Sequence, residues 1–315
     1  MEKIDLSFVI PAKNEQDSLE ALYQEILQAV EPLKKSIEFI FIDDGSTDDT
    51  YKRLESLHQR DTRVKIIKLR GNFGKSIALQ EGFNKARGSI VFTLDADLQD
   101  NPKEIPAFLR KIDEGFDLVS GWKKERHDPS LSKVLPSRIL NLLTRLLTRV
   151  RIHDTNCGFK AYRREVINNL NLYGELYRFI PVLASKQNFK VGEITVEHRP
   201  RKYGETKFGW ERGVKGILDL LTVVFLTDYM RRPGHFFGTL GLISFFSGFI
   251  IGAYITYLRL TTGTIQDRQP LLFLGMLLMI IGIQLISTGL LAEMITYWRQ
   301  KDMKNTTDQV IAKSL

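Results

Sequence analysis

Two long uncharged apolar runs near the C-terminus constrain the fold of this chain most strongly. Phe236–Leu258 and Pro270–Ala292 each span 23 residues without one Asp, Glu, Lys, Arg or His. As a helix, each run would be about 34 Å long, enough to cross a hydrocarbon core of about 30 Å. The alternative, a pair of helices buried in a soluble core, is disfavoured because core helices are seldom uncharged over such a length. The sequence therefore predicts a transmembrane hairpin over 233–298, followed by a basic tail over 299–315.

The charges that flank these runs predict their orientation. Arg231 and Arg232 precede the first run and three cations follow the second within 299–304, whereas the linker between the runs carries two Arg and one Asp. Because Lys and Arg concentrate on the cytoplasmic side of a membrane, we expect both the N-terminal part and the tail in the cytoplasm. Met1–Asp5 lacks the pattern of a signal peptide, which agrees with that orientation.

The composition disfavours several other classes of protein. A single cysteine, Cys157, excludes an internal disulfide framework and fits a reducing compartment. The five histidines do not cluster with it at zinc-ligand spacing. The net charge of +8 would suit nucleic acid, but in a chain with a membrane hairpin anionic lipid is the simpler partner. We therefore expect a membrane as partner and no nucleic acid.

Residues 1–208 have the pattern of an α/β domain. We expect strands at Leu6–Pro11, Ile37–Ile42, Val64–Leu69 and Ser89–Leu94, alternating with helices at Ser18–Val30, Asp48–His58 and Asn72–Ala86. Such alternation with short loops predicts a mostly parallel sheet covered by helices on both faces. In these sheets ligands bind beyond the carboxyl ends of the strands. The loops at Asn14, Asp43, Gly71 and Asp95 all follow strands, so one nucleotide could touch all four.

Two later segments have the periodicity of amphipathic helices. In Ser132–Val150 the apolar residues fill one side and three arginines lie beside them. This segment is either an ordinary helix packed on the domain or a cationic helix at a membrane. In Trp210–Asp228 an apolar stripe lies opposite Arg212, Lys215 and Asp219. This segment could also be a helix packed on the domain, but it runs directly into the first apolar run. We therefore expect an interfacial helix over 209–232.

The segment Asp95-Ala96-Asp97-Leu98-Gln99 directly follows the fourth predicted strand. In an extended segment, side chains two residues apart point the same way, which would gather two carboxylates and an amide oxygen around one point. These are hard oxygen ligands suited to Mg²⁺ or Mn²⁺, and such a metal neutralises a departing diphosphate. The alternative is that the two aspartates are surface acids that cap a turn before Pro102.

Two further loops carry groups suited to a nucleotide. Carboxylates at Asp43 and Asp44 could accept bonds from base N–H groups and ribose hydroxyls. The alternative is a helix start with Thr47 or Asp48 as N-cap, and both descriptions can hold together. Arg70–Lys75 opens the third helix with free backbone N–H groups and cations, which suit phosphate. It lacks the phosphate-loop pattern, which excludes an ATPase of that type.

Five segments together resemble the inverting family 2 glycosyltransferases, which have a GT-A fold. They are Val9–Glu15, Ile42–Ser46, Leu94–Gln99, Asp154–Phe159 and Arg201–Lys207. The match is to the polyprenyl-phosphate branch, and the C-terminal hairpin resembles its bacterial members, which implies a bacterial inner membrane. The resemblance implies transfer of a hexose, most simply glucose from UDP-glucose rather than from a GDP-sugar, onto a polyprenyl phosphate. Mannose, galactose or a modified pentose as the sugar, and guanine as the base, stay open.

The resemblance also implies roles for individual residues. The nucleotide-sugar would contact Pro11, Asn14, Glu15, Asp43, Asp44, Lys75, Asp95, Ala96, Arg201 and Lys207. Asp97 and Gln99 would hold Mg²⁺ or Mn²⁺, and Asp95, Asp97 and Asp154 would form the catalytic set. Because a phosphate acceptor is already largely a dianion at neutral pH, we expect Asp154 to orient the sugar or a cation rather than to remove a proton.

The lipid phosphate would be bound by basic and hydroxyl groups after the strand that ends at Gly121-Trp122. The resemblance assigns this role to Arg126, Lys133, Ser137 and Arg138. Relatives usually carry Gly-Ser-Arg where this chain reads Gly121-Trp122-Lys123. Which of Lys123, Lys124 and Arg126 contacts the phosphate therefore stays open.

Two other functions remain as alternatives. A processive polysaccharide synthase would need more membrane segments and a Q-x-x-R-W motif, and the sequence has neither. A non-enzymatic membrane scaffold is disfavoured by the intact Asp95–Gln99 segment. In the first apolar run, the small residues Ser244, Gly248 and Gly252 share one helix face, which predicts either packing within the hairpin or a homo-oligomer.

Overall fold

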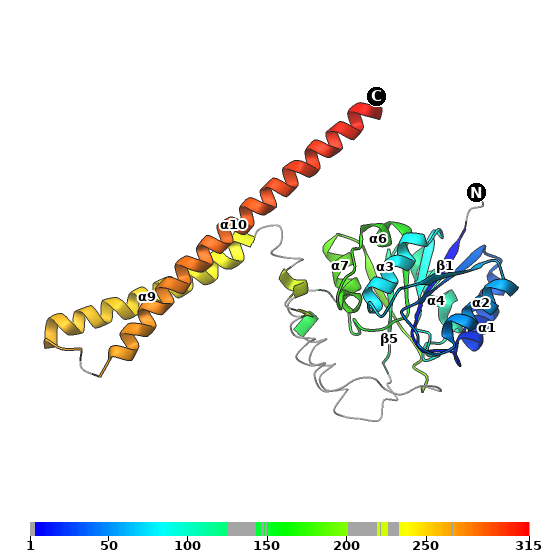
Figure 1. The fold of residues 1–315 in the computed structure, drawn as a ribbon, viewed down its shortest axis with the longest axis horizontal. Helices are drawn as coiled ribbons and strands as arrows, with labels where there is room; N and C mark the ends of the chain where they lie inside the picture. Colours follow the sequence, from blue (N-terminus) through cyan, green and yellow to red (C-terminus); the bar gives the residue numbers. More distant parts are fainter. Residues whose placement is uncertain are drawn as a thin grey trace. The chain divides into compact units, whose positions relative to one another are not determined.

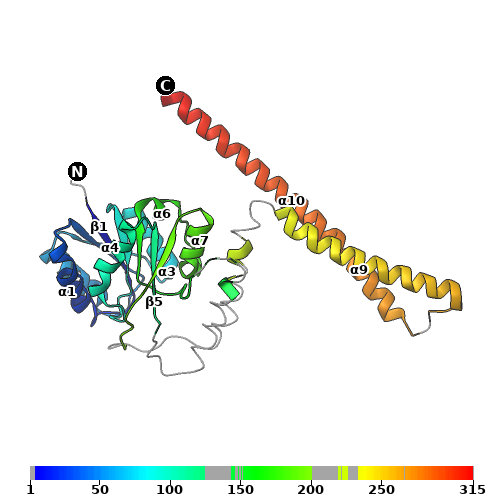
Figure 2. The ribbon, with the colours of Figure 1, turned by 180° about the vertical axis from the view of Figure 1, so that it is seen from behind.

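The structure is a computed structural model. It describes residues 4–124, 143–145, 148, 150, 152–200, 219–220, 222–225, 233–265 and 267–314. The chain divides into two compact units, Met1–Val223 and Val224–Leu315. The first unit holds the sheet, and the second consists mainly of two long helices (Figures 1 and 2).

A seven-stranded sheet organises the first unit. Its strands are β1 Leu6–Ala12, β2 Ile37–Asp43, β3 Val64–Lys68, β4 Ile90–Thr93, β5 Leu118–Trp122, β6 Lys160–Arg163 and β7 Val191–Thr195. They lie in the order β3-β2-β1-β4-β6-β5-β7, and β6 runs antiparallel to both of its neighbours while the other described pairs are parallel. The prediction of a mostly parallel sheet in an α/β fold is confirmed.

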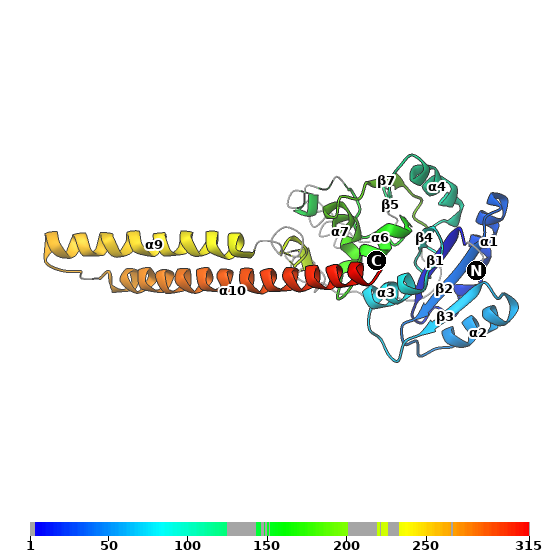
Figure 3. The same ribbon diagram turned by 90° about the horizontal axis from the view of Figure 1, so that it is seen from above.

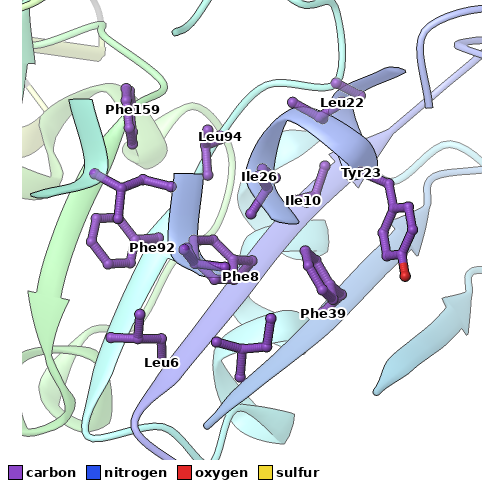
Figure 4. Packing of buried hydrophobic residues seen from close by; sticks show 14 of the residues in the cluster. Leu6, Phe8, Ile10, Leu22, Tyr23, Ile26, Phe39, Phe92, Leu94 and Phe159 are labelled. Atoms are coloured by element: carbon purple, nitrogen blue, oxygen red, sulfur yellow. The ribbon is translucent and has the colours of Figure 1, made fainter. Parts of the chain in front are cut away.

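Helices cover both faces of this sheet. They are α1 Leu19–Val30, α2 Thr50–Arg60, α3 Lys75–Lys85, α4 Ile105–Asp113, α6 Arg164–Asn169 and α7 Ile180–Lys186, with short 3₁₀ turns at Glu31–Leu33, Pro102–Glu104 and Leu176–Phe179. On one face Phe8 of β1 stacks between Phe39 and Phe92, with ring centroids 5.5 and 5.4 Å apart, beneath α1 (Figure 4). On the other face α3 packs so closely on β1 that a side chain at Gly82 would overlap Val9. Burial on both faces explains why the central strands β1, β2 and β4 are mostly apolar.

The start of α2 differs from the prediction. The helix begins at Thr50 with Asp49 in the N-cap position, so the predicted cap at Thr47 or Asp48 is wrong by one or two residues. The backbone N–H of Thr47 donates instead to Asn14 Oδ1 at 2.8 Å, which ties the turn to the loop after β1. Asp48 Oδ1 accepts the N–H of Thr50 at 3.0 Å. A contact between two loops distant in sequence therefore shifts the start of α2 to Thr50.

Part of the predicted interfacial helix is described, and its residues up to Val223 belong to the first unit. Residues 219–220 and 222–225 are helical, and Leu220 and Val223 are buried. One carboxylate oxygen of Asp219, a residue expected on the polar side, is also buried. Burial raises the pKa of Asp219, while the charge of Arg178 opposes that rise. The rest of this segment, and most of Ser132–Val150, lie outside the described residues.

The second unit is a helical hairpin. The helix α9 spans Pro233–Thr262 and α10 spans Gln269–Ser314, and the two lie side by side (Figure 3). Both are long and apolar enough to cross a membrane, by length and composition. Each predicted apolar run falls inside one of them.

Glycines bring the two helix backbones into contact. A Cβ at Gly241 would lie 2.7 Å from the carbonyl oxygen of Gly282, and one at Gly248 would overlap that of Gly275. Ser244 Oγ donates to the Leu278 carbonyl at 2.8 Å. Packing within the hairpin therefore accounts for Ser244 and Gly248. Gly252 has no atom within 4 Å of its would-be Cβ and does not take part.

A carboxylate closes one end of the hairpin. Glu293 of α10 accepts the backbone N–H of Gly234 at 2.9 Å, in the first turn of α9. The first N–H groups of a helix have no partner within the helix and carry partial positive charge, so an acid suits this position. Glu293 thus holds the start of α9 against α10.

We predict that Gly248→Leu destabilises the hairpin and that Gly252→Leu does not. The first change forces bulk into a backbone contact, and overpacking of this kind costs about 1–3 kcal/mol. Thermal unfolding of the two variants in the same detergent would measure the difference. Equal melting temperatures for both variants would contradict the close packing.

Candidate active site

The carboxylate of Asp95 lies at the carboxyl edge of the sheet, just beyond β4. Its Oδ1 is paired with the ammonium of Lys75, the first residue of α3. Burial alone would raise the pKa of Asp95, but the charge of Lys75 and its hydrogen bond hold that pKa below its usual range. A Cβ at Gly158 would lie 2.5 Å from Asp95 Oδ2, so only glycine lets that loop lie against the carboxylate. Asp95 is therefore a fixed anion at this edge.

Residues 96–98 form a turn rather than the extended segment assumed from the sequence. Leu98 has a left-handed backbone, with φ of 61°, and its side chain is 4% exposed within the hydrophobic core. This anchor holds the turn in a conformation that costs about 1–3 kcal/mol for a residue other than glycine. The turn brings Asp97 Oδ1 to 3.2 Å from the backbone N–H of Gln99. This bond holds the Asp97 carboxylate against the backbone of Gln99, and metal ligation by these two residues stays a prediction.

The loop is also tied to the segment that follows β7. The N–H of Arg199 donates to the Gln99 carbonyl at 3.0 Å, and Gln99 Nε2 donates to the Arg199 carbonyl at 3.4 Å. Asp97 is 8% exposed, so it is not a surface acid. The 3₁₀ turn Pro102–Glu104 is capped by Asn101, which accepts the Lys103 N–H at 3.1 Å.

The chemistry of this loop fits a divalent metal held jointly with a ligand. Among the described residues, no three His, Cys, Asp or Glu side chains gather as a metal site. Asp97 and Gln99 offer a carboxylate and an amide, and a carboxylate completed by water and substrate phosphates is how Mg²⁺ is usually bound. The residues present therefore fit Mg²⁺ or Mn²⁺ bound together with a diphosphate.

Three loops that follow β1, β2 and β3 are joined by hydrogen bonds. Asn14, in a left-handed conformation with φ of 55°, donates its N–H to Ser46 Oγ at 3.0 Å. The N–H of Glu15 donates to Thr50 Oγ1 at 2.8 Å. Gly45 lies so near the third loop that a Cβ there would be 2.5 Å from the Gly71 carbonyl carbon. Of the other predicted nucleotide contacts, Pro11 lies in β1 and Ala96 is buried beside Asp95.

The two neighbouring aspartates after β2 differ in what they bind. Both oxygens of Asp44 accept backbone N–H groups, from Phe73 at 2.7 Å and from Gly74 at 3.0 Å. Asp43 Oδ1 accepts the Ser46 N–H at 3.0 Å, whereas its Oδ2 is buried without a hydrogen-bond partner among the described residues. Asp44 therefore orders a loop, whereas Asp43 keeps one buried acceptor oxygen without a partner in the described part of the chain.

Asp154 lies in the loop that leads into β6 and is buried. Its N–H donates to Glu193 Oε1 at 3.0 Å, and its Oδ1 accepts the Asn156 N–H at 3.1 Å. The adjacent His153 ring stacks on Trp122 at the end of β5, with centroids 4.3 Å apart. These contacts fix the backbone of the loop that carries the Asp154 carboxylate.

Lys160, which the sequence analysis did not single out, begins β6 at the same edge. Its ammonium donates to the Cys157 carbonyl, and the residue is 3% exposed. Burial lowers its pKa, and Asp154 and Asp95 attract its charge from a distance. In the described part of the chain no carboxylate lies within ion-pair distance of it. The sequence signal was present, since Lys160 directly follows the Asp154–Phe159 segment.

The other predicted site residues are not placed by the structure. Arg126, Lys133, Ser137, Arg138, Arg201 and Lys207 lie outside the described residues. Their roles toward the lipid phosphate and the diphosphate stay predictions.

We predict that Cys157 is inert toward thiol reagents in the folded protein. Burial raises its pKa to about 12, so almost no thiolate exists at neutral pH. Iodoacetamide labelling followed by mass spectrometry should show no modification in the native state and full modification after denaturation. Rapid native labelling would contradict the burial.

We predict that substitution of Asp43 affects nucleotide binding and that substitution of Asp44 affects stability. Asp43→Asn should weaken binding of a nucleoside diphosphate with little change in melting temperature. Asp44→Ala should lower the free energy of unfolding by about 1.5–3 kcal/mol, since it removes an ionised acceptor from two part-buried N–H groups. Calorimetric titration and thermal unfolding measure both quantities. The assignment fails if Asp43→Asn binds the nucleotide as the wild type does.

Comparisons with known proteins agree with this geometry. The chain matches the family model Glycosyl transferase family 2 over residues 7–170. It is 37% identical over 311 residues to a dodecaprenyl-phosphate galacturonate synthase of Rhizobium johnstonii, covering 97% of this chain and 92% of that protein. It is 36% identical over 292 residues to an undecaprenyl-phosphate 4-deoxy-4-formamido-L-arabinose transferase of Salmonella choleraesuis, covering 92% and 88%.

A solved structure supports the fold alone. Glucosyl-3-phosphoglycerate synthase of Mycobacterium tuberculosis, in complex with Mn²⁺, UDP-glucose and phosphoglyceric acid, superposes with a TM-score of 0.53 at 21% identity. The match covers 72% of this chain and 81% of that one. The predicted GT-A architecture is confirmed by this likeness together with the sheet order.

Proposed function

The chain belongs to glycosyl transferase family 2, in its polyprenyl-phosphate branch, and on that premise we propose that it transfers a sugar from a nucleotide-sugar onto a polyprenyl phosphate. The predicted family, branch and enzyme class are therefore confirmed. The observation that carries the proposal is the fixed Asp95–Lys75 pair beside Asp97 and Gln99 at the ligand edge of the sheet.

The described residues offer binding and orientation rather than proton removal. The second pKa of a phosphate monoester is near 6, so the acceptor is already a good nucleophile at neutral pH. We assign Asp154 the role of orienting the sugar, because its carboxylate is buried and its backbone is held by Glu193. Alignment of a phosphate oxygen with the anomeric carbon is then worth up to about 7–11 kcal/mol.

Charge at the edge supports departure of the diphosphate. When bound at Asp97 and Gln99, Mg²⁺ or Mn²⁺ supplies positive charge to the leaving group. Lys160, whose pKa is lowered by burial, has no carboxylate within ion-pair distance in the described part of the chain and would gain an anionic partner when a diphosphate binds. Asp43 Oδ2 is the acceptor we assign to the nucleoside, because it is the buried oxygen left without a partner there.

The acceptor sets where the reaction takes place. A polyprenyl tail stays in the bilayer because each buried CH₂ group is worth about 0.8 kcal/mol. The phosphate must therefore be met at the membrane surface, and α9 and α10 anchor the enzyme there. The cationic flanks of the hairpin support the cytoplasmic face as that surface.

The sugar and the base are finer parts of the proposal. We retain glucose from UDP-glucose as the first donor to test. The names of the two relatives add galacturonate and 4-deoxy-4-formamido-L-arabinose as competing sugars. A panel of nucleotide-sugars with undecaprenyl phosphate, read out by the mass of the lipid product, distinguishes them. No glycosylated lipid with any donor would contradict the proposed function.

We predict that transfer requires a divalent metal and the carboxylate of Asp97. Excess EDTA should abolish transfer and added Mn²⁺ should restore it. Asp97→Asn should lower transfer by more than about 100-fold, since even partners behind a metal ligand cost 10–100-fold. Asp113→Asn, an exposed residue of α4, is the matched control and should retain full activity. Undiminished transfer in EDTA would remove the metal from the mechanism.

A further inference from the structure

A buried ion pair joins the metal loop, defined here as residues 97–100, to the end of β5. Lys123 Nζ lies 2.9 Å from Asp100 Oδ1. Asp100 is 1% exposed, and the side chain of Lys123 is 12% exposed. Few surface ion pairs matter to a structure, but a pair withdrawn from water to this degree fixes both partners.

Asp100 is connected to the active site on two sides. Its Oδ2 lies 3.5 Å from the backbone N–H of Asp95, at the outer limit of a hydrogen bond. Its backbone forms an antiparallel bridge with His198, beside the bonds between Gln99 and Arg199. The Lys123 ammonium therefore acts on the residue that ends the metal loop and touches the backbone of Asp95.

The charge of Lys123 is compensated within the protein by Asp100. Burial alone would lower its pKa, but the negative charges of Asp100 and Asp95 raise it well above the usual range. Lys123 is therefore charged at every physiological pH. With a carboxylate at 2.9 Å, little of that charge is left for a second anion. Lys160 at the same edge differs, because no carboxylate lies within ion-pair distance of it among the described residues.

Lys123 ends the segment Gly121-Trp122-Lys123, where relatives usually carry Gly-Ser-Arg. The resemblance leaves Lys123 as one candidate for the cation that contacts the lipid phosphate. If Lys123 moved away to bind another anion, Asp100 would remain in the metal loop as a buried charge without a partner. That state is strongly unfavourable. The contacts thus favour an internal role for this lysine.

We propose that Lys123 and Asp100 are positioning residues, whose ion pair holds the metal loop so that Asp97 and Gln99 meet the metal–diphosphate group, and that Lys123 does not bind the lipid phosphate. This inference rests on the proposed function. Residues behind metal ligands typically change metal affinity or activity 10–100-fold when they are replaced. The same range is expected here.

The test uses the full chain in detergent and two measurements. Calorimetric titration gives the Kd of UDP in the presence of Mn²⁺, with GDP as the second probe, and thermal unfolding gives the melting temperature. The variants are Lys123→Met, Asp100→Asn and the double variant Lys123→Met/Asp100→Leu. Lys111→Met is the matched control, because it removes a lysine from a partly exposed pair with Glu114 at the end of α4.

Each single variant leaves one buried charge unpaired, so it should lower the melting temperature and raise the Kd by about 10–100-fold. The double variant replaces the pair by apolar side chains, which is often neutral for stability. It should recover the melting temperature while its Kd stays raised. A double variant that recovers both values shows a purely structural pair and overturns the proposal.

A kinetic measurement separates the competing role. If Lys123→Met raises the KM for undecaprenyl phosphate while the Kd of UDP with Mn²⁺ is unchanged, Lys123 binds the acceptor and the proposal is wrong. If the wild-type chain binds neither UDP nor GDP with Mn²⁺, the proposed function itself fails, and the positioning role fails with it. Tight binding by the wild type together with wild-type Kd in every folded variant overturns the positioning role alone.

Discussion

The carboxyl edge of the sheet pairs aspartates with lysines in positions that are partly or fully withdrawn from water, and the candidate site depends on that pairing. Asp95 is held by Lys75, and Asp100 by Lys123. Removing a carboxylate from water is costly unless an opposite charge and further hydrogen bonds compensate it. The pairs therefore fix the carboxylates in place, and a fixed anion can position a ligand without first reorganising.

The strand order explains why these charges meet. β1, β2, β4 and β5 all end at the same edge, and β6, which runs the other way, begins there with Lys160. Because β6 lies between β4 and β5, the loop that carries Asp154 reaches the edge beside the loop that carries Asp95. Segments about 60 residues apart in the chain thus contribute to one site through a single antiparallel strand.

Local pattern was sufficient for much of this description. The first four strands and the three helices between them follow from apolar runs and helical periodicity, and their observed bounds lie within about three residues of the predicted ones. The ligand edge follows from alternation alone. The turn at residues 96–98 could not be predicted from the sequence. Its left-handed Leu98 is stabilised by core contacts that no local pattern reveals. The same holds for Asp44, whose two acceptor bonds come from a loop about 30 residues away.

The hairpin follows different physics from the domain that precedes it. In a bilayer no hydrophobic force drives two helices together, since lipid tails are as apolar as leucine. Association then depends on close backbone contact, which requires small residues where the helices meet, as at Gly241 and Gly282. Ser244 and Glu293 add directed hydrogen bonds at two points along the pair. A hairpin fixed by shape and by two polar contacts can anchor the enzyme in the membrane that holds its acceptor, while all described site residues stay in the other unit.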